Sequence, residues 1–401
     1  MEKRTKFIMP ALFSIFIATM LYWFLTQVVA SGGAMPTLDL ACFGKNFVAS
    51  EDAGNIVANL VYSFTDFGEG PFFTDFIAAI FTVAGGFLAA YLEKIGSPLK
   101  GTGTGGSGYK WYWLACSQFI ALILSNYIWR HLINIGGTFV PTFTPMVSCL
   151  PMAILMFGKP NIKKAATGII FGVLLPVILV WLLIEYMAVP MGWPLFAAIG
   201  PGMAIASVIA TEIYRKLPWM NEDMDDPAPI ANIAPYDPEI DKVHNEAWHL
   251  TFRRAFGGDV SELYFWGANI SGLGAIIGVI VSTIINPANN GCGALIPEFI
   301  FLFIFATSVG MIIWGPKYQK DGYAFTFEGV LMTGAMIGAL GGDLKILIPL
   351  AIVLEFVGPA IIHWALTQKF FQRHAAAVPV QGFAGIMTII LAVIFKAAGL
   401  M

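Results

Sequence analysis

The stretch IIFGVLLPVILVWLLI, residues 169–184, decides the fold class of this chain. It contains no charged side chain and does not alternate apolar with polar residues, as a strand of a membrane β-barrel would. The whole chain has the same character, with 57% hydrophobic and 12% charged residues. Soluble domains have about 25% charged residues. The sequence therefore predicts an all-α polytopic integral membrane protein.

Eleven apolar windows are long enough to cross the hydrocarbon core as helices. They are residues 8–30, 72–92, 111–129, 139–157, 165–189, 193–214, 263–285, 294–315, 325–341, 345–366 and 378–396. The first window has a basic start and could be read as a secretory signal. Its apolar run of about 23 residues is too long for one, so we expect an uncleaved helix.

The Pro-rich segment GGTFVPTFTPMVSCLP, residues 136–151, tests the number of crossings, because each crossing reverses every later loop. With eleven crossings and the N-terminus inside, 18 of the 22 Lys and Arg residues lie on the cytoplasmic side. If this segment does not cross, 8 lie inside and 14 outside. Basic residues favour the cytoplasmic side. We therefore expect an interrupted helix here, and an N-in, C-out topology.

The only long cytoplasmic stretch, residues 215–262, divides the remaining helices into two sets of five. The first set begins outside and the second inside, which predicts a 5+5 inverted-topology repeat plus one N-terminal helix. The linker starts as a Pro-rich acidic run, and from Asp237 its pattern predicts an amphipathic surface helix. The expected regions are residues 1–30 (first helix), 31–71 (external segment), 72–214 (first half), 215–262 (linker) and 263–401 (second half).

Interrupted helices in corresponding positions of two halves indicate a solute site near the membrane midplane. Here the third helices correspond, the Pro-rich segment and GVLMTGAMIGALGG, residues 329–342. Close helix packing by Gly is the alternative explanation. Our candidate substrate-binding residues are the polar and glycine positions Gly137, Thr138, Thr142, Thr144, Ser148, Asn126, Asn269 and Thr333. The threonines could instead bond to their own helices, and Asn126 and Asn269 could join helix to helix.

Glu355 is the first candidate for ion coupling, because it lies midway along an apolar window. Pro359 has no N–H for the carbonyl of Glu355, so a carboxylate and a free carbonyl are expected at one residue. These oxygen ligands suit H+ or Na+, whereas a protonated Glu bonded to a neighbouring helix is the alternative. Glu328, near a cytoplasmic end, and His363 complete the set, although His363 also fits ordinary packing.

Two features of the outer side leave alternatives open. Residues 31–71 carry Asp39, Glu51, Asp52, Asp66 and Glu69 against Lys45, and could form a cation-concentrating vestibule or a plain solvated loop. Cys42 and Cys292 are both expected outside, where a disulfide and free thiols are equally compatible with the sequence.

The leading functional prediction is a secondary active transporter of a small polar solute, coupled to H+ or Na+ and working by alternating access. The alternative is a channel or a permease component of a larger system, and an intramembrane enzyme ranks third. We expect no enzyme activity, no cofactor, no metal site and no nucleic-acid partner. The expected surroundings are a lipid bilayer, of the plasma membrane or bacterial inner membrane, with a homo-oligomer left open.

Overall fold

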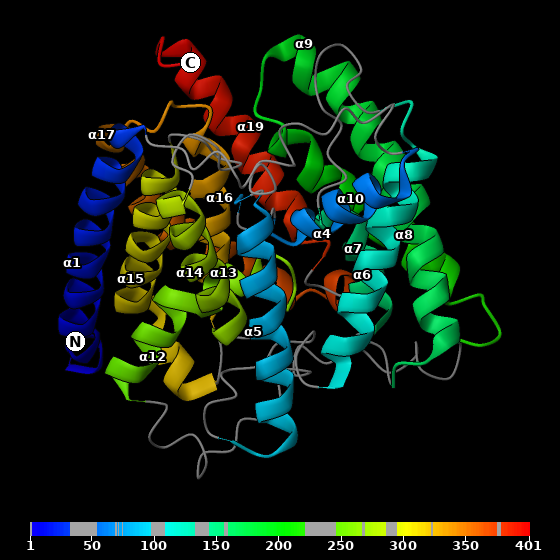
Figure 1. Ribbon diagram of the computed structural model, residues 1–401, viewed down its shortest axis with the longest axis horizontal. Coiled ribbons are helices and arrows are strands. Elements are labelled where there is room, and N and C mark those ends of the chain that lie inside the picture. Colours follow the sequence, from blue (N-terminus) through cyan, green and yellow to red (C-terminus); the bar gives the residue numbers. More distant parts are fainter. Residues whose placement is uncertain are drawn as a thin grey trace.

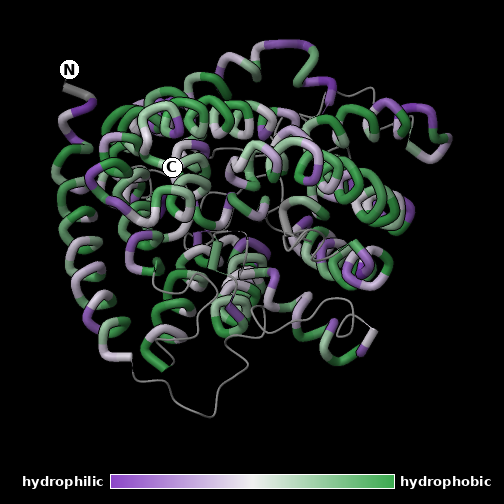
Figure 2. The backbone as a smooth tube through the Cα atoms, turned by 90° about the horizontal axis from the view of Figure 1, so that it is seen from above, coloured by the Kyte–Doolittle hydropathy of each residue, from purple (hydrophilic) through white to green (hydrophobic). Residues whose placement is uncertain are grey.

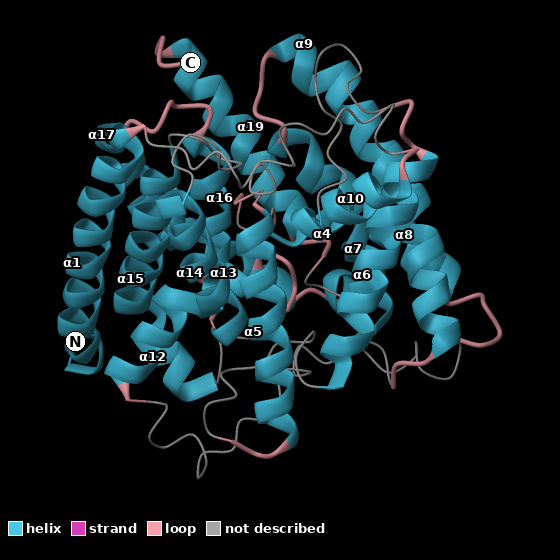
Figure 3. Cartoon of the chain, viewed as in Figure 1, coloured by secondary structure: helices cyan, strands magenta, loops and turns pink. Residues whose placement is uncertain are grey.

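The computed structural model describes residues 2–32, 54–68, 70, 72–73, 75–97, 109–132, 144–155, 159–220, 246–266, 269–285, 295–321, 324–374 and 378–401. These residues are all-helical, at 83% helix with no strand (Figure 3). The gaps contain several segments singled out above, so Gly137, Thr138 and Thr142, the Cys42 and Cys292 pair, and most of the linker lie outside the described residues.

Each of the eleven apolar windows contains a helix in its described part. The helices are α1 (Glu2–Ser31), α5 (Phe76–Lys94), α6 (Tyr109–Ile128), α7 (Thr144–Leu155), α8 (Ile162–Leu183), α10 (Phe196–Tyr214), α14 (Asn269–Ile285), α15 (Ile296–Asp321), α16 (Phe327–Ile337), α17 (Leu344–Leu366) and α19 (Gln381–Ala397). Shorter elements are α4 (Ile56–Thr65), η2 (Asp66–Gly68), η5 (Ile184–Ala188), α9 (Val189–Met191), α12 (Ala247–Arg253), η6 (Arg254–Gly258), α13 (Asp259–Glu262) and α18 (Lys369–Arg373).

Six of these helices are long and apolar enough to cross a membrane: α1, α5, α8 with its η5 and α9 continuation, α10, α15 and α17. The surface of the bundle is correspondingly apolar. On α1 alone, Leu12, Phe16 and Trp23 are each more than half exposed, and Figure 2 shows hydrophobic residues along the outer helices. Exposed apolar helices around buried polar groups are what a lipid environment requires. The chain is thus a helical, multi-pass membrane protein.

Short polar side chains begin several of the helices by accepting hydrogen bonds from free backbone N–H groups. Asp75 accepts from Ala78 N at the start of α5, at 2.7 Å. Asn161 does the same for α8, and Asp343 for α17. This cap accounts for the position of Asp343 at the start of an apolar helix.

The structure places α7 and α16 inside the bundle, and they are the two shortest of the apolar helices. With 12 and 11 residues they are about 18 and 16 Å long, against about 30 Å of hydrocarbon. Both are buried along nearly their whole lengths. The two segments predicted to be interrupted therefore form short, enclosed helices.

The ten apolar helices after α1 are named by the two halves predicted from the sequence: α5, α6, α7, α8 and α10 for the first half, and α14, α15, α16, α17 and α19 for the second half. Within each half the third helix packs against the second, fourth and fifth. Between the halves, α5 packs against α14 and α10 against α19, which are the first and the fifth helices of each set. Figure 1 shows α1 outside this arrangement, alongside α15.

The contacts between α5 and α14 are antiparallel and reciprocal. A Cβ added at Gly85 would lie 2.6 Å from Ile270 O, and one added at Gly278 would lie 2.7 Å from Ala78 Cα and 3.0 Å from Ile77 O. Gly278 follows Gly85 by 193 positions, as Ile270 follows Ile77. Each helix therefore presents the same positions to the other, as in a two-fold arrangement.

The end of the predicted linker differs from expectation. An amphipathic helix on the membrane surface was predicted, but α12, η6 and α13 pack against α1, α14 and α15, with α13 well inside the bundle (Figure 1). Glycines make this approach feasible, because a Cβ added at Gly272 of α14 would lie 2.7 Å from the carbonyl carbon of Gly257. The expected start of that helix at Asp237 lies outside the described residues.

The external segment is also more ordered than a plain loop. Its described part forms α4, which begins at the Asn55 cap and packs against α5 and α6. Asp66, one of the acids assigned to a solvated vestibule, is fully buried in η2. The vestibule prediction is therefore wrong for Asp66, and its other acids lie outside the described residues.

Candidate functional site

The most highly charged part of the described interior is centred on Arg254, in the η6 turn. Arg254 is 1% exposed, and its Nη1 and Nη2 atoms donate to the two carboxylate oxygens of Glu262 at 2.7 and 2.6 Å. Nη2 also contacts Asp259 Oδ1. Short π-helical segments such as η6 are often found at functional sites. One guanidinium therefore holds two buried acids within nine residues of chain.

Asp259 connects this ion group to the second half. Its two carboxylate oxygens accept hydrogen bonds from Thr307 of α15, at 2.7 Å, and from Thr326 at the start of α16, at 2.9 Å. The ring of Tyr318 covers the guanidinium, with its centre 5.0 Å from Arg254 Cζ. The carboxylate of Asp259 thus has a donor from each neighbouring element, as a buried charge needs.

A second polar pair lies on the other side of Glu262. Glu328, in the first turn of α16, accepts a hydrogen bond from Gln381 of α19 at 2.8 Å. Glu328 was predicted near a cytoplasmic helix end, and it is fully buried. None of the described residues forms a hydrogen bond to its other carboxyl oxygen. The residue therefore lies in the polar interior of the bundle.

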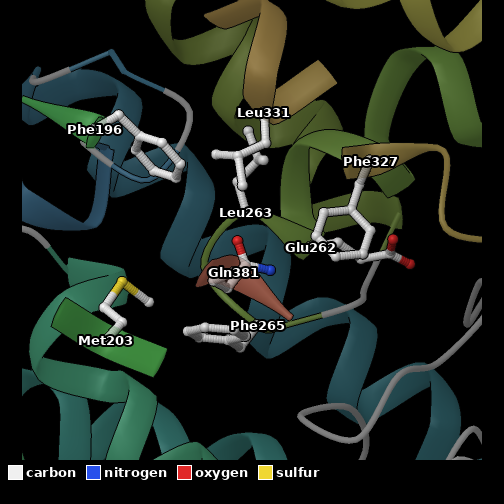
Figure 4. Close-up of a pocket in the computed structure, with 8 residues that line it drawn as sticks. All are labelled: Phe196, Met203, Glu262, Leu263, Phe265, Phe327, Leu331 and Gln381. Atoms are coloured by element: carbon white, nitrogen blue, oxygen red, sulfur yellow. The ribbon is translucent and has the colours of Figure 1, made fainter. Parts of the chain in front are cut away.

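Glu262 and Gln381 line a small cavity between the two halves (Figure 4). Its volume is about 10 Å³, which is room for roughly one water molecule. The lining comes from α10, the α13 to α14 connection, α16 and α19: Phe196, Met203, Glu262, Leu263, Phe265, Phe327, Leu331 and Gln381. The cavity is thus closed to larger solutes in this conformation, and both halves contribute to its wall.

Glu355 lies in the middle of α17, fully buried as predicted. Its carboxyl group fills a slot between Gly310 of α15 and Gly329 of α16, where a Cβ at either glycine would collide with it. Among the residues that the structure describes, none forms a hydrogen bond to either carboxyl oxygen. Its backbone carbonyl was expected to be free, but Trp314 Nε1 donates to it at 2.8 Å. A neighbouring helix therefore compensates for the N–H that Pro359 lacks.

His363 follows Glu355 in α17 and lies among aromatic rings. Its ring centre is 5.4 Å from that of Trp314 and 5.5 Å from that of Phe325. This surrounding fits the packing interpretation of His363 better than a place beside the Arg254 group. Its predicted role in ion coupling stays a prediction.

The predicted substrate-binding residues that the structure describes lie in separate places rather than at one site. Asn126 donates to Ser63 of α4 at 3.0 Å, which joins two helices. Thr333 donates to its own helix at Gly329 O, at 2.7 Å. Asn269 packs against Gly257 and Gly258 at the start of α14. Among the remaining two, Ser148 is buried in α7 and the side chain of Thr144 is not described.

Sequence reasoning missed Asp259 and Glu262, because they follow a polar linker and no apolar window encloses them. A signal was present in the sequence. Asp66, Glu69 and Phe72 recur as Asp259, Glu262 and Phe265, each 193 positions later. Phe72 and Phe265 are also the non-glycine residues with positive φ in the described chain, at 64° and 67°. A shared D-x-x-E-x-x-F motif thus precedes the first helix of each half.

Comparisons with known proteins add no assignment, since no family model, no curated protein and no solved structure matches the chain. Among the described residues, no group of three or more His, Cys, Asp or Glu side chains is arranged to hold a metal ion. The functional argument therefore depends on the geometry of the buried acids and on the arrangement of the helices around them.

Proposed function

We propose that this protein is a secondary active transporter for a small polar solute, coupled to H+ or Na+. The observation that carries the proposal is the placement of four buried acids beside a cavity between the halves: Asp259, Glu262 and Glu355 near the Arg254 guanidinium, and Glu328 bonded to Gln381 at the cavity wall. Ionisable groups are costly in a membrane interior and usually serve function there. Because the group contains more acids than bases, it can bind a cation and release it again.

We also infer that the two halves form an inverted repeat. The D-x-x-E-x-x-F motif, the left-handed Phe72 and Phe265, and the reciprocal contacts of α5 with α14 all support it. The α10 and α19 pair has similar features, because a Cβ at Gly200 would lie 3.0 Å from Gly385 N. Antiparallel packing of corresponding helices is what a two-fold axis in the membrane plane produces.

Eleven crossings with the N-terminus inside are part of this proposal. In Figure 1 the N-terminus lies at the lower end of α1 and the C-terminus near the top of the view, in keeping with an odd number of crossings. In this scheme α7 and α16 are interrupted crossings that enclose the solute path. Alternating access would then consist of rocking about the two glycine-lined contacts, α5 with α14 and α10 with α19. The plasma membrane or bacterial inner membrane would be its location.

The test is transport by the purified full chain in proteoliposomes. Solutes that raise its melting temperature in a screen of amino acids, amines, sugars and carboxylates would be chosen for uptake assays. Uptake against a solute gradient that requires a pH or Na+ gradient would support the proposal. Uptake that ignores both gradients would favour the channel or permease alternative.

Glu355→Gln provides the matched variant, with Glu298→Gln as its control, because Glu298 is on α15 outside the buried acid group and bonds Tyr22. We expect Glu355→Gln to lose gradient-driven accumulation and Glu298→Gln to retain it. Full coupled transport by Glu355→Gln would contradict the assigned role.

A further inference from the structure

We infer that the coupling ion of this protein is a proton, and that Glu355 carries it as a neutral carboxylic acid in the conformation described. This inference deepens the proposed function, which leaves H+ and Na+ open. It rests on three features of the slot around Glu355: its missing donors, its lack of space and the charges that face it.

The first feature is the lack of hydrogen-bond donors to the Glu355 carboxyl group among the described residues. A buried carboxylate normally accepts several hydrogen bonds or pairs with a base, because an isolated charge in a low-dielectric interior is very unfavourable. Glu355 is 0% exposed, and within the described part of the chain neither Oε1 nor Oε2 has a hydrogen-bond partner. Asp259 of the same region, by contrast, has two hydroxyl donors and a contact with Arg254. Protonation removes the charge that Glu355 cannot otherwise compensate.

The slot also has no space for a metal ion. The backbones of Gly310 and Gly329 press against the carboxyl group so closely that even a methyl group would not fit at either position. Hard cations need several oxygen ligands around them. The one backbone oxygen that Pro359 releases on α17 is that of Glu355 itself, and Trp314 Nε1 already donates to it. A proton needs neither the space nor the extra ligands.

The surrounding charges favour the neutral acid as well. From the α12 to α13 segment, Arg254 and Asp259 interact electrostatically with Glu355, and Arg254 is already shared between Asp259 and Glu262. Glu328, beside Gly329, faces the same region from α16. Lys317 and Asp321 of α15 pair with each other at the end of the helix, near His363. An ionised Glu355 would thus add a charge to a group with more acids than bases.

The geometry also gives a route for the proton. Glu328 precedes Gly329, the glycine that closes the slot, and Glu328 accepts from Gln381 at the cavity wall. If α16 separates from α17, the O–H bond of Glu355 can break and the proton passes to water entering from the cavity. The carboxylate that remains is then hydrated. Closure of the slot would need a proton to return, which couples the movement of α16 to protonation.

Infrared spectroscopy of the full chain in phosphatidylethanolamine and phosphatidylglycerol vesicles tests this directly, without any transported solute. We expect a protonated-carboxyl C=O band near neutral pH that is absent from Glu355→Gln and present in Glu298→Gln. Replacing Na+ by K+ at constant pH should leave the band unchanged. A missing Glu355-dependent band, or a band lost on adding Na+, would overturn the inference.

A second measurement needs no variant. Dicyclohexylcarbodiimide adds to protonated carboxyl groups in apolar surroundings, and mass spectrometry locates the adduct. Labelling at Glu355, with none at the paired and half-exposed Glu212, is the expected result, whereas protection by Na+ at fixed pH would contradict it. A protonated Glu355 in a protein that transports no solute would reject the proposed function but not the protonation of Glu355. Na+-driven transport without labelling of Glu355 would reject the proton as the coupling ion but not the proposed function.

Discussion

The two regions that precede α5 and α14 share a sequence motif and a backbone conformation but differ in their charged residues. Both have the D-x-x-E-x-x-F motif, and both turn through a left-handed Phe into the first helix of their half. In the described part of the first region, Asn126 donates to Ser63 and Ser63 to Asn59, and the buried acid Asp75 accepts a hydrogen bond from Ser282. The second contains Arg254, at a position where the first has Val61.

This difference teaches that two regions with the same motif can differ in charge, because a buried guanidinium is present at this position in the second region alone. Gln118 of the first half reinforces the contrast, because it bonds to the backbone of Tyr264 and to the indole of Trp266 at 3.0 and 2.6 Å. These neutral bonds join the halves without introducing a charge. Four of the buried acids, Asp259, Glu262, Glu328 and Glu355, lie instead in the segment from α13 to α17, where a change in protonation would alter the packing.

The largest effect should come from Arg254→Met. This change leaves Asp259 and Glu262 buried without their base, and breaking a buried pair in this way costs about 3 to 5 kcal/mol. Thermal unfolding in detergent micelles would measure it. Arg373→Met is the control, because its pair with Glu212 is 54% and 41% exposed and such pairs contribute at most about 1 kcal/mol. Equal losses of stability in the two variants would show that the buried ion pairs of Arg254 contribute no more than an exposed ion pair.

The next largest losses of stability are expected for Gly85→Ala and Gly278→Ala, which test the reciprocal packing of α5 and α14. Each added methyl group meets the backbone of the opposite helix, and overpacking of this kind costs about 1 to 3 kcal/mol. We expect similar losses for the two variants, measured by the same unfolding assay. Gly338→Ala is the control, since nothing lies within 4 Å of its added carbon. A large loss for only one of the pair would argue against reciprocal packing.

Trp314→Phe should have a smaller effect. It removes the donor to the Glu355 carbonyl, and one hydrogen bond contributes about 1 kcal/mol. Trp364→Phe, on the exposed side of α17, controls for the change in ring size. If Trp314→Phe and Trp364→Phe unfold at the same temperature, the hydrogen bond from Trp314 to the carbonyl of Glu355 does not contribute to the stability of the protein.

The smallest change in stability is expected for Glu355→Gln. The amide resembles a protonated acid in size and charge, so the free energy of unfolding should shift by less than about 1 kcal/mol. An ionised Glu355 in the same slot would predict a clear stabilisation instead, because the variant would remove an uncompensated charge. Unfolding of the variant and the native chain at neutral pH separates these outcomes.

The helical membrane class could be predicted from the sequence because lipid selects long apolar segments regardless of their partners. The same logic identified Glu355, since a carboxyl group in the middle of an apolar window has few explanations. It also located α7 and α16, because Pro and Gly limit helix length through the local backbone. These predictions depend only on neighbours in the chain.

Only the tertiary structure brought Arg254, Asp259 and Glu262 into the interior, because their burial depends on glycines of α14 that lie later in the chain. It likewise assigned the carbonyl of Glu355 to Trp314, and it placed Asn126, Asn269 and Thr333 in separate helix contacts. Hydropathy reports how a segment partitions between water and lipid. The partner that each buried polar atom finds is decided by packing between distant segments.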